Sequence, residues 1–361
     1  MKKTLLALAV LGTAGIAHAQ TAVVIDGSID NSVINREFKN SAGVSTNRTI
    51  MERNQRNTNY IGISGTEDLG RGLKAIFQIR TGYGSDDHLN NTATGAGGTA
   101  GAAAIGDQNV WLGLQGGFGT VKLGRDLTPA FLQTSAYSVF GTGFLRNFGS
   151  MNVGTASARW SNSISYTTPK MGGFGLQIMT ASRHEVSGAA TAAIATPEGT
   201  PISARLSYGA GPLSAGLAIT RNGGNNGTTS DSTLWNLGGS YDFGVAKIKA
   251  QYERDNNTRT ASTTNRSSNG TLLGATDIGN AWLVGAEGGI PGTAVVLKAQ
   301  YAKRNTATMF TPFEKAYGIG ADYNMSKRTV AYLYLGKTET VGTAATAGSN
   351  RDAVIGVRHA F

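Results

Sequence analysis

The sequence contains no cysteine and only seven prolines among its 361 residues. The lack of cysteine excludes disulfide bonds, which exported soluble domains often use for stability. The low proline content argues against a disordered Pro/Gly-rich linker, although glycine, at 51 residues, has roughly twice its usual share. After the N-terminal segment no apolar run reaches the ~18 residues that a membrane-spanning helix needs, which excludes an ordinary helical membrane protein.

The N-terminal segment has the pattern of an export signal. Lys2 and Lys3 precede a mostly apolar stretch, residues 5–16, and Ala17-His18-Ala19 is a small-residue cleavage site. We therefore expect a cleaved signal peptide at residues 1–19 and a single mature domain at residues 20–361. A retained membrane anchor is the alternative, but the apolar stretch is short for a spanning helix.

The charge distribution and the motifs give little support for nucleic-acid binding, metal binding or catalysis. The chain has 32 basic and 22 acidic residues. The basic residues are spread singly, so binding to nucleic acid is not expected. None of the four histidines has metal-ligand spacing, and no G-x-S-x-G elbow is present. We therefore predict no metal site, no cofactor and no catalytic residues, and the protein is not expected to be an enzyme.

Side chains alternate with a period of two over many segments of about ten residues. In residues 246–253 the odd positions are Lys, Lys, Gln and Glu, and the even positions are Ala, Ile, Ala and Tyr. Residues 73–81 alternate in the same way, with Ile76 as an exception. This pattern predicts β-strands, because successive side chains of a strand point to opposite faces.

Two kinds of connection alternate between these segments. Seven are short and rich in Gly, Pro or Asp, at 67–70, 116–119, 169–173, 209–212, 242–244, 288–292 and 324–327. Eight are long and polar, at 36–55, 85–106, 127–157, 184–200, 221–232, 255–279, 305–314 and 339–350. Fifteen connections join sixteen antiparallel strands, which matches the even strand number, short periplasmic turns and long external loops of bacterial transmembrane barrels.

A sheet of this size in lipid must close into a barrel, because open edges would leave N–H and C=O groups unpaired. The apolar face should meet lipid and the charged face should line a water-filled interior, since sixteen strands enclose an aqueous channel. The all-β chain is therefore expected in the bacterial outer membrane. The last strand, ending at Phe361, should pair with the first strand near residues 23–33. Aromatic residues beside the short turns predict an interfacial girdle: Phe118, Tyr166, Phe174, Tyr208, Tyr241, Phe243 and Tyr323.

Several segments resemble the general porins of Gram-negative bacteria, especially those of the β-proteobacterial type. They are Asp26-Gly27, the run from Gly65 to Phe77, Leu112-Gly113-Leu114, Gly119 to Arg125, Ser161 to Tyr166, and the ending Gly356 to Phe361. The resemblance implies passive diffusion of small hydrophilic solutes and inorganic ions through a homotrimer. It also implies a third loop folded into the lumen, and contacts with outer-membrane lipid and lipopolysaccharide.

Only some of the charged residues that line the family's pore constriction have counterparts in this sequence. Arg125, in Leu-Gly-Arg, and Arg159, before Ser161-Asn162, are similar to constriction arginines of the family. Tyr60 stands where the family usually has an arginine on the second strand. Arg80 stands where the third strand usually has an acid. The resemblance therefore implies a basic cluster with altered geometry.

The third long loop, residues 127–158, has no Asp or Glu, and its only charge is Arg146. Arg125, Arg159, Arg80, Lys74 and Arg146 are the residues we expect near the constriction, with Asp126 as the nearest acid in sequence. A basic constriction walled by protein enriches anions. We therefore predict a channel that prefers anions.

Other functions remain open at this point. Aromatic residues of the third loop form either an apolar track for sugars or organic anions in a substrate-selective channel, or packing that holds the loop to the wall: Phe131, Tyr137, Phe140, Phe144 and Phe148. A barrel hydrolase and a surface adhesin are further alternatives, because fold alone does not determine substrate.

Overall fold

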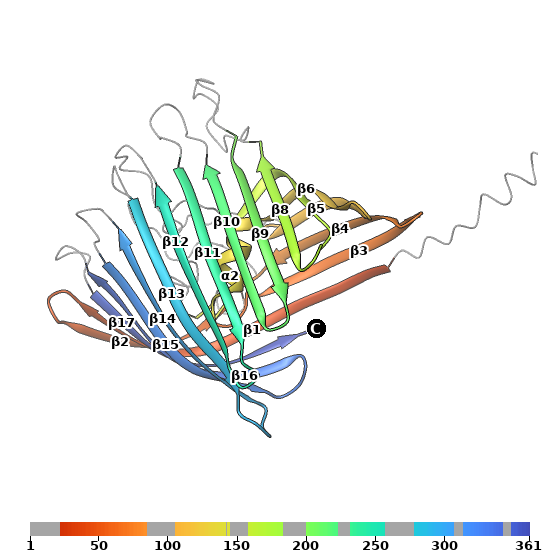
Figure 1. Ribbon diagram of the computed structural model, residues 1–361. Coiled ribbons are helices and arrows are strands. Elements are labelled where there is room, and N and C mark those ends of the chain that lie inside the picture. The colour runs from red at the N-terminus through yellow and green to blue at the C-terminus, as the bar shows by residue number, and fades with distance from the viewer. Residues whose placement is uncertain are drawn as a thin grey trace, which may run out of the picture.

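The protein, seen here as a computed structural model, is a closed antiparallel sheet with a helix inside it (Figure 1). The structure describes residues 22–84, 105–141, 143–144, 158–182, 200–222, 232–256, 278–306, 313–341 and 348–361. The predicted signal peptide and the loop residues Arg146 and Phe148 lie outside these residues. The strands are β1 (Ala22–Asn40), β2 (Ser45–Arg53), β3 (Tyr60–Gly70), β4 (Leu73–Gly82), β5 (Asn109–Gly116), β6 (Gly119–Leu127), β7 (Arg159–Thr167), β8 (Phe174–Ala181), β9 (Ile202–Ala210), β10 (Leu213–Asn222), β11 (Ser232–Asp242), β12 (Lys247–Asn256), β13 (Ile278–Gly289), β14 (Val295–Thr306), β15 (Phe313–Asn324), β16 (Thr329–Val341) and β17 (Gly348–Ala360).

From β3 to β17 each strand pairs with the next strand along the chain, and β17 pairs with β1 to close the ring. β1 is long and has two partners on its other side: residues 31–39 pair with β2, and residues 22–28 pair with β3. β2 and β3 are therefore successive parts of one wall strand. The seventeen strand segments thus form the predicted sixteen-stranded barrel.

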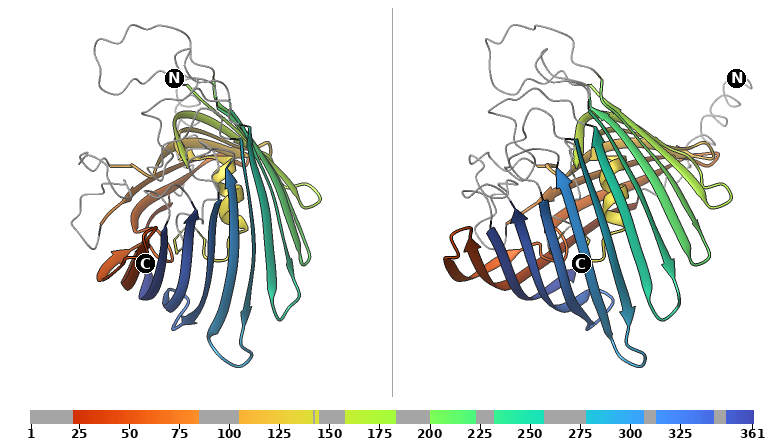
Figure 2. Two further views of the ribbon diagram at one scale, coloured as in Figure 1. Left: turned by 90° about the vertical axis from the view of Figure 1, so that its left-hand side faces the viewer. Right: turned by 60° about the vertical axis from the view of Figure 1, so that its left-hand side comes forward.

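The first predicted long loop, 36–55, differs from the structure. β1 continues to Asn40 and β2 begins at Ser45, so most of this segment is a β-hairpin with a tight turn at 41–44. Its strands carry polar residues on both faces, including Arg36, Glu37 and Asn47, so they lack the alternation from which strands were predicted. Each of the seven predicted short connections is present, at one end of the barrel (Figure 2), but the first is displaced: residues 67–70 belong to β3, and the turn lies at 71–72.

The faces are arranged as the alternation predicts. Small and polar side chains point inward and are buried, among them Ser28, Asp30, Ser163, Ser203, Thr220 and Asn236. Large apolar side chains point outward and are exposed, among them Ile61, Leu112, Leu206, Leu237, Ile319, Leu333 and Ile355. This inside-out distribution suits a wall between lipid and a polar interior.

The aromatic girdle is also found at the turn end. Phe118, Tyr166, Phe174, Tyr241, Phe243 and Tyr323 are exposed there. Two pairs of rings are in tilted contact: the ring centroids of Phe174 and Tyr208 lie 4.7 Å apart, and those of Tyr241 and Phe243 lie 4.6 Å apart. Rings with one polar edge favour the boundary between lipid and water.

The helix α2 (Pro129–Ala136) belongs to the third loop and lies within the ring of strands (Figures 1 and 2). Thr128 caps it, because its hydroxyl accepts from the Phe131 amide at 3.2 Å, and Pro129 suits the first turn, where no amide donor is needed. Because this helix lies inside the barrel, the third loop enters the lumen as predicted.

Among the described residues no helix is long and apolar enough to span a membrane.

Candidate functional site

The third loop follows the inner wall and narrows the interior. Its helix contacts β9, β10 and β11. The Gln133 side chain joins the helix to the wall, because its amide donates to the Gly216 carbonyl at 2.5 Å and its oxygen accepts from Arg205 Nε at 2.9 Å. The Tyr137 hydroxyl lies 3.2 Å from Ser214 Oγ. The beginning of the loop is thus anchored by polar contacts to the neighbouring strands β9 and β10.

Beyond the helix, the loop is held by packing. Tyr137, Phe140 and Phe144 are buried, and Phe131 is partly buried. The ring centroids of Phe140 and Phe144 each lie 5.1 Å from that of Tyr334 on β16. Gln300 Oε1 on β14 accepts from the Val139 amide at 2.8 Å. For the described aromatics the packing interpretation is confirmed, and the apolar track for sugars or organic anions is not favoured.

Two glycines on the inner wall allow this close approach. A Cβ at Gly238 would overlap the Tyr137 ring, and a Cβ at Gly285 would overlap Val139. Both glycines lie on strands behind the loop, β11 and β13. Any larger residue at these positions would push the loop away from the wall.

We expect Gly238→Leu to lower the free energy of unfolding by about 1–3 kcal/mol, the usual cost of overpacking. Guanidinium unfolding in detergent, followed by circular dichroism, measures this loss. Gly209→Leu is the matched control, because no atom lies within 4 Å of a Cβ at Gly209. Equal unfolding midpoints for the two variants would contradict a loop held against Gly238.

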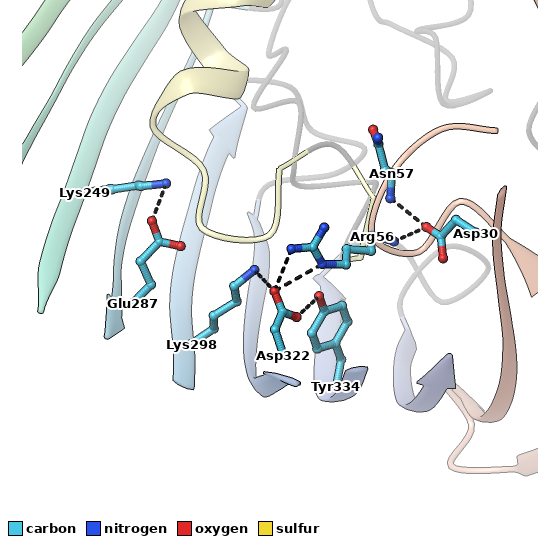
Figure 3. Close-up of polar contacts among 8 residues, drawn as sticks. All are labelled: Asp30, Arg56, Asn57, Lys249, Glu287, Lys298, Asp322 and Tyr334. Atoms are coloured by element: carbon cyan, nitrogen blue, oxygen red, sulfur yellow. Dashed lines mark hydrogen bonds and ion pairs between the residues drawn. The ribbon is translucent and has the colours of Figure 1, made fainter. Parts of the chain in front are cut away.

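A second segment, residues 54–59 between β2 and β3, also turns into the lumen, and we call it the inner strap (Figure 3). Asp30 on β1 holds it, because Asp30 Oδ2 accepts from the Arg56 amide at 2.7 Å and from the Asn57 amide at 2.6 Å. The strap also meets the tip of the third loop, where the Phe144 amide donates to the Gln55 carbonyl. The interior is therefore narrowed by two segments that bond to each other.

Arg56 extends from the strap to a buried carboxylate on β15 (Figure 3). Asp322, which is 2% exposed, lies 3.0 Å from Arg56 Nη2 and 2.7 Å from Lys298 Nζ. It also accepts from the Tyr334 hydroxyl at 2.6 Å. Two cations thus share one carboxylate inside the barrel. The sequence prediction missed Arg56, because nothing near it in the chain indicates an acid 266 residues away.

Arg80 and Tyr60 lie together on the inner face of β3 and β4. The Arg80 guanidinium carbon is 3.8 Å from the centre of the Tyr60 ring, a cation–π contact. Arg80 Nη2 also approaches Asp26 Oδ2 on β1 at 3.4 Å. Tyr60, at the position where the resemblance implies an arginine, therefore supports a basic side chain instead of supplying one.

Arg125 and Arg159 lie where β6 and β7 meet at a register shift between Gly124 and Asp126. Arg125 donates to two neutral acceptors, the Asp107 carbonyl at 2.7 Å and Ser161 Oγ at 2.8 Å. The charge of Arg159 interacts with those of Arg125 and Arg80, and with the carboxylates of Asp107 and Asp126. The structure thus brings three predicted residues, Arg80, Arg125 and Arg159, into one group, which we call the arginine cluster.

Lys74, also predicted near the constriction, lies at the turn end. It is the second residue of β4, next to the turn at 71–72, and it is exposed. Six residues separate it from Arg80, which is ~20 Å along a strand. The structure therefore does not bring Lys74 to the arginine cluster, and its role at the constriction stays a prediction.

Other inward-facing cations differ in how well they are neutralised. Lys122 pairs with Asp126 at 2.9 Å, and Lys249 pairs with Glu287 at 2.9 Å (Figure 3). Arg205 and Arg358, in contrast, donate to neutral side chains, Gln133 at 2.9 Å and Ser28 at 3.2 Å. Among the described residues, Arg125, Arg205 and Arg358 thus donate to neutral groups, whereas Lys122 and Lys249 face carboxylates.

Known outer-membrane porins match this chain over its whole length. The family described as "Gram-negative porin" matches residues 4–343. Outer membrane porin protein 32 of Delftia acidovorans is 31% identical over 390 aligned positions, which cover 100% of both chains. An outer membrane porin protein of Bordetella pertussis is 28% identical over 407 aligned positions and also covers both chains completely.

Solved structures agree with this match. An anion-selective porin from Comamonas acidovorans superimposes with a TM-score of 0.75 at 28% identity, covering 95% of this chain and 100% of that chain. OmpT of Vibrio cholerae in its trimer form gives a TM-score of 0.61 at 14% identity, covering 94% of this chain and 99% of that chain, which is a likeness of fold alone.

Proposed function

Because the chain belongs to the Gram-negative porin family, we propose that its aqueous passage through the outer membrane prefers anions. As a porin it is a passive channel of the outer membrane and not an enzyme. The observation that carries the preference is the arginine cluster, where the charge of Arg159 interacts with those of Arg80 and Arg125 and where Arg125 donates to neutral acceptors. A solved structure at 28% identity is that of an anion-selective porin, which supports the same direction.

The physical basis is the field in a narrow, protein-walled passage. Two unit charges ~4 Å apart interact by ~1 kcal/mol in bulk water and by ~4 kcal/mol at an effective permittivity of 20. Even the smaller value exceeds RT, so a net positive charge at the constriction enriches anions several-fold. The third loop adds no acid, since residues 127–158 contain neither Asp nor Glu. Arg146 of that loop belongs to the same proposal, although it lies outside the described residues.

A planar-bilayer recording in a ten-fold KCl gradient tests this proposal. We expect the reversal potential of the native protein to have the anion sign, with chloride several-fold more permeant than potassium. A potential of the cation sign would refute the anion preference. The protein purified from outer membranes should begin at Gln20, since we propose that residues 1–19 are removed, and it should close in three equal steps, since we propose a homotrimer.

A further inference from the structure

The described part of the third loop covers a long arc of the inner wall. Its helix contacts β9, β10 and β11, and the Val139 amide donates to Gln300 on β14. The rings of Phe140 and Phe144 pack on Tyr334 of β16. Since these strands follow one another round the ring, the loop forms a ledge along the wall from β9 to β16.

The inner strap continues this ledge to β1 (Figure 3). At the tip of the third loop the Phe144 amide donates to the Gln55 carbonyl of the strap. From this contact the strap extends between two wall strands, since Arg56 pairs with Asp322 on β15 and the Arg56 amide donates to Asp30 on β1. Loop and strap together therefore line the arc from β9 to β1, whereas the arginine cluster lies on β4, β6 and β7, outside this arc.

The strap is a closed turn that fits closely against its neighbours. Its two ends are joined, because the Asn59 amide donates to Asn54 Oδ1 at 2.6 Å. Asn54 has a φ of 65°, a left-handed conformation that asparagine adopts more readily than most residues. The Asn59 side chain accepts from the Asp30 amide at 2.6 Å. On the other side a Cβ at Gly143 would overlap the Gln55 carbonyl, so the strap is held between the wall and the loop.

Two acids of the inner wall lie behind the strap. They are Asp30 and Asp322, which are 0% and 2% exposed. Asp30 lies opposite Arg358 on β17, and Asp322 lies 2.7 Å from Lys298 Nζ. The charges of these four wall residues balance, so a route along this arc would select ions only weakly. Arg56 adds a positive charge in front of them, and the strap that carries it covers both acids.

We propose that the inner strap, held in place by Arg56, determines the size limit and the charge preference of the passage by closing the arc beside β15, β16, β17 and β1. Ions and solutes are thereby directed along β3 to β8, where the arginine cluster lies. Arg56 is a positioning residue, because it acts through the strap and not by contact with the solute. The proposal rests on the protein being an open porin, and the size limit can be measured whatever the sign of the ion preference.

A shortened strap tests the proposal, with residues 55–58 replaced by two glycines and the purified variant recorded in planar bilayers. We expect the single-channel conductance to rise about two-fold, because a second route conducts beside the first. The permeability ratio of chloride to potassium should fall about two-fold, since the added route carries balanced charge. In a liposome-swelling assay the variant should admit sugars that are too large for the native protein. Circular dichroism should show equal strand content in both proteins.

Two point variants separate the position of the strap from its charge. Arg56→Gln and Lys298→Gln each remove one positive charge and one partner of the same carboxylate, Asp322, but only Arg56 belongs to the strap. We expect both variants to shift the reversal potential toward the cation sign by similar amounts. Only Arg56→Gln should raise the conductance and the size limit. Arg56→Lys keeps the charge and one contact with Asp322, so it should restore most of the native size limit.

Three results would overturn the proposal: a native size limit and conductance in the shortened variant, equal size limits for Arg56→Gln and Lys298→Gln, and a shortened variant that prefers anions more strongly than the native protein. If the shortened variant does not assemble, the two point variants decide alone. A native protein with a reversal potential of the cation sign would refute the anion preference. A larger size limit of Arg56→Gln than of Lys298→Gln would still support the role of the strap.

Discussion

Replacement of Arg80, Arg125 and Arg159 by glutamate is expected to turn the reversal potential in a KCl gradient to the cation sign. Arg159 on β7 interacts with Arg80 on β4 and Arg125 on β6, so their replacement exchanges three positive side chains for three negative ones in one part of the lumen. A guanidinium group ~8 Å from a permeating ion contributes about 1 kcal/mol at an effective permittivity near 40. After screening by salt, whose Debye length is ~10 Å at 0.1 M, we expect the permeability ratio to change about ten-fold or more.

The same reversal of charge outside the lumen provides the control. Lys170→Glu, Lys327→Glu and Arg328→Glu alter exposed residues of the short turns and should shift the potential far less. Single replacements show how much each arginine contributes to the shift, since Arg80 pairs with Asp26 at 3.4 Å whereas Arg125 donates its hydrogen bonds to neutral acceptors and interacts with Asp107 by charge alone. A triple variant that keeps the anion sign, or a control that shifts as much, would contradict the assignment of selectivity to this cluster.

Asp322→Ala is expected to lower the free energy of unfolding by roughly 3–5 kcal/mol, the usual effect of removing one partner of a buried ion pair. Asp322 is almost fully buried and accepts from Lys298, Arg56 and Tyr334. Without it two cations and a hydroxyl lose their acceptor in the interior. The guanidinium midpoint in detergent measures the loss, and the reversal potential should shift further toward the anion sign, because a negative charge has gone.

A compensating variant and a surface variant complete this experiment. Asp322→Ala combined with Lys298→Met removes one cation as well and should recover part of the stability. Asp242→Ala deletes an exposed carboxylate that lies 3.2 Å from Lys247 and should have a much smaller effect, because solvent screens an exposed pair. If Asp322→Ala proved as mild as Asp242→Ala, the carboxylate would not hold the strap and the wall together.

Features set by neighbouring residues could be predicted from the sequence. Residues 246–253 alternate because one face of the strand meets lipid and the other faces the interior. The strand predicted from this alternation is found as β12, at residues 247–256. The short turns depend on local glycine, proline and aspartate, and each is found, although the one predicted at 67–70 lies at 71–72. The contact of Arg80 with Tyr60 lies within one hairpin, because β3 and β4 pair directly and place both residues near its loop end.

Features set by remote residues could not be predicted. The inner strap is defined by Asp30 and Asp322, which precede and follow Arg56 by 26 and 266 residues. No local pattern indicates that a polar segment will turn inward. The hairpin of β1 and β2 was missed for another reason: polar residues on both faces remove the alternation that marks a strand in lipid. Lys74 was placed at the wrong height for a third reason. The alternation of a strand shows which face a residue lies on, but not how far along the barrel axis it lies.

The position of β17 constrains how the barrel is made. β1 pairs with the final residues of the chain, and Gly27 and Phe361 exchange backbone hydrogen bonds of 3.0 and 3.1 Å. A polypeptide still emerging during export lacks this seam, so its first strand would carry unpaired amides and carbonyls into hydrocarbon. Insertion therefore has to wait until synthesis and export are complete, and a truncated product missing the thirteen residues of β17 would be left with an open edge, ready to aggregate.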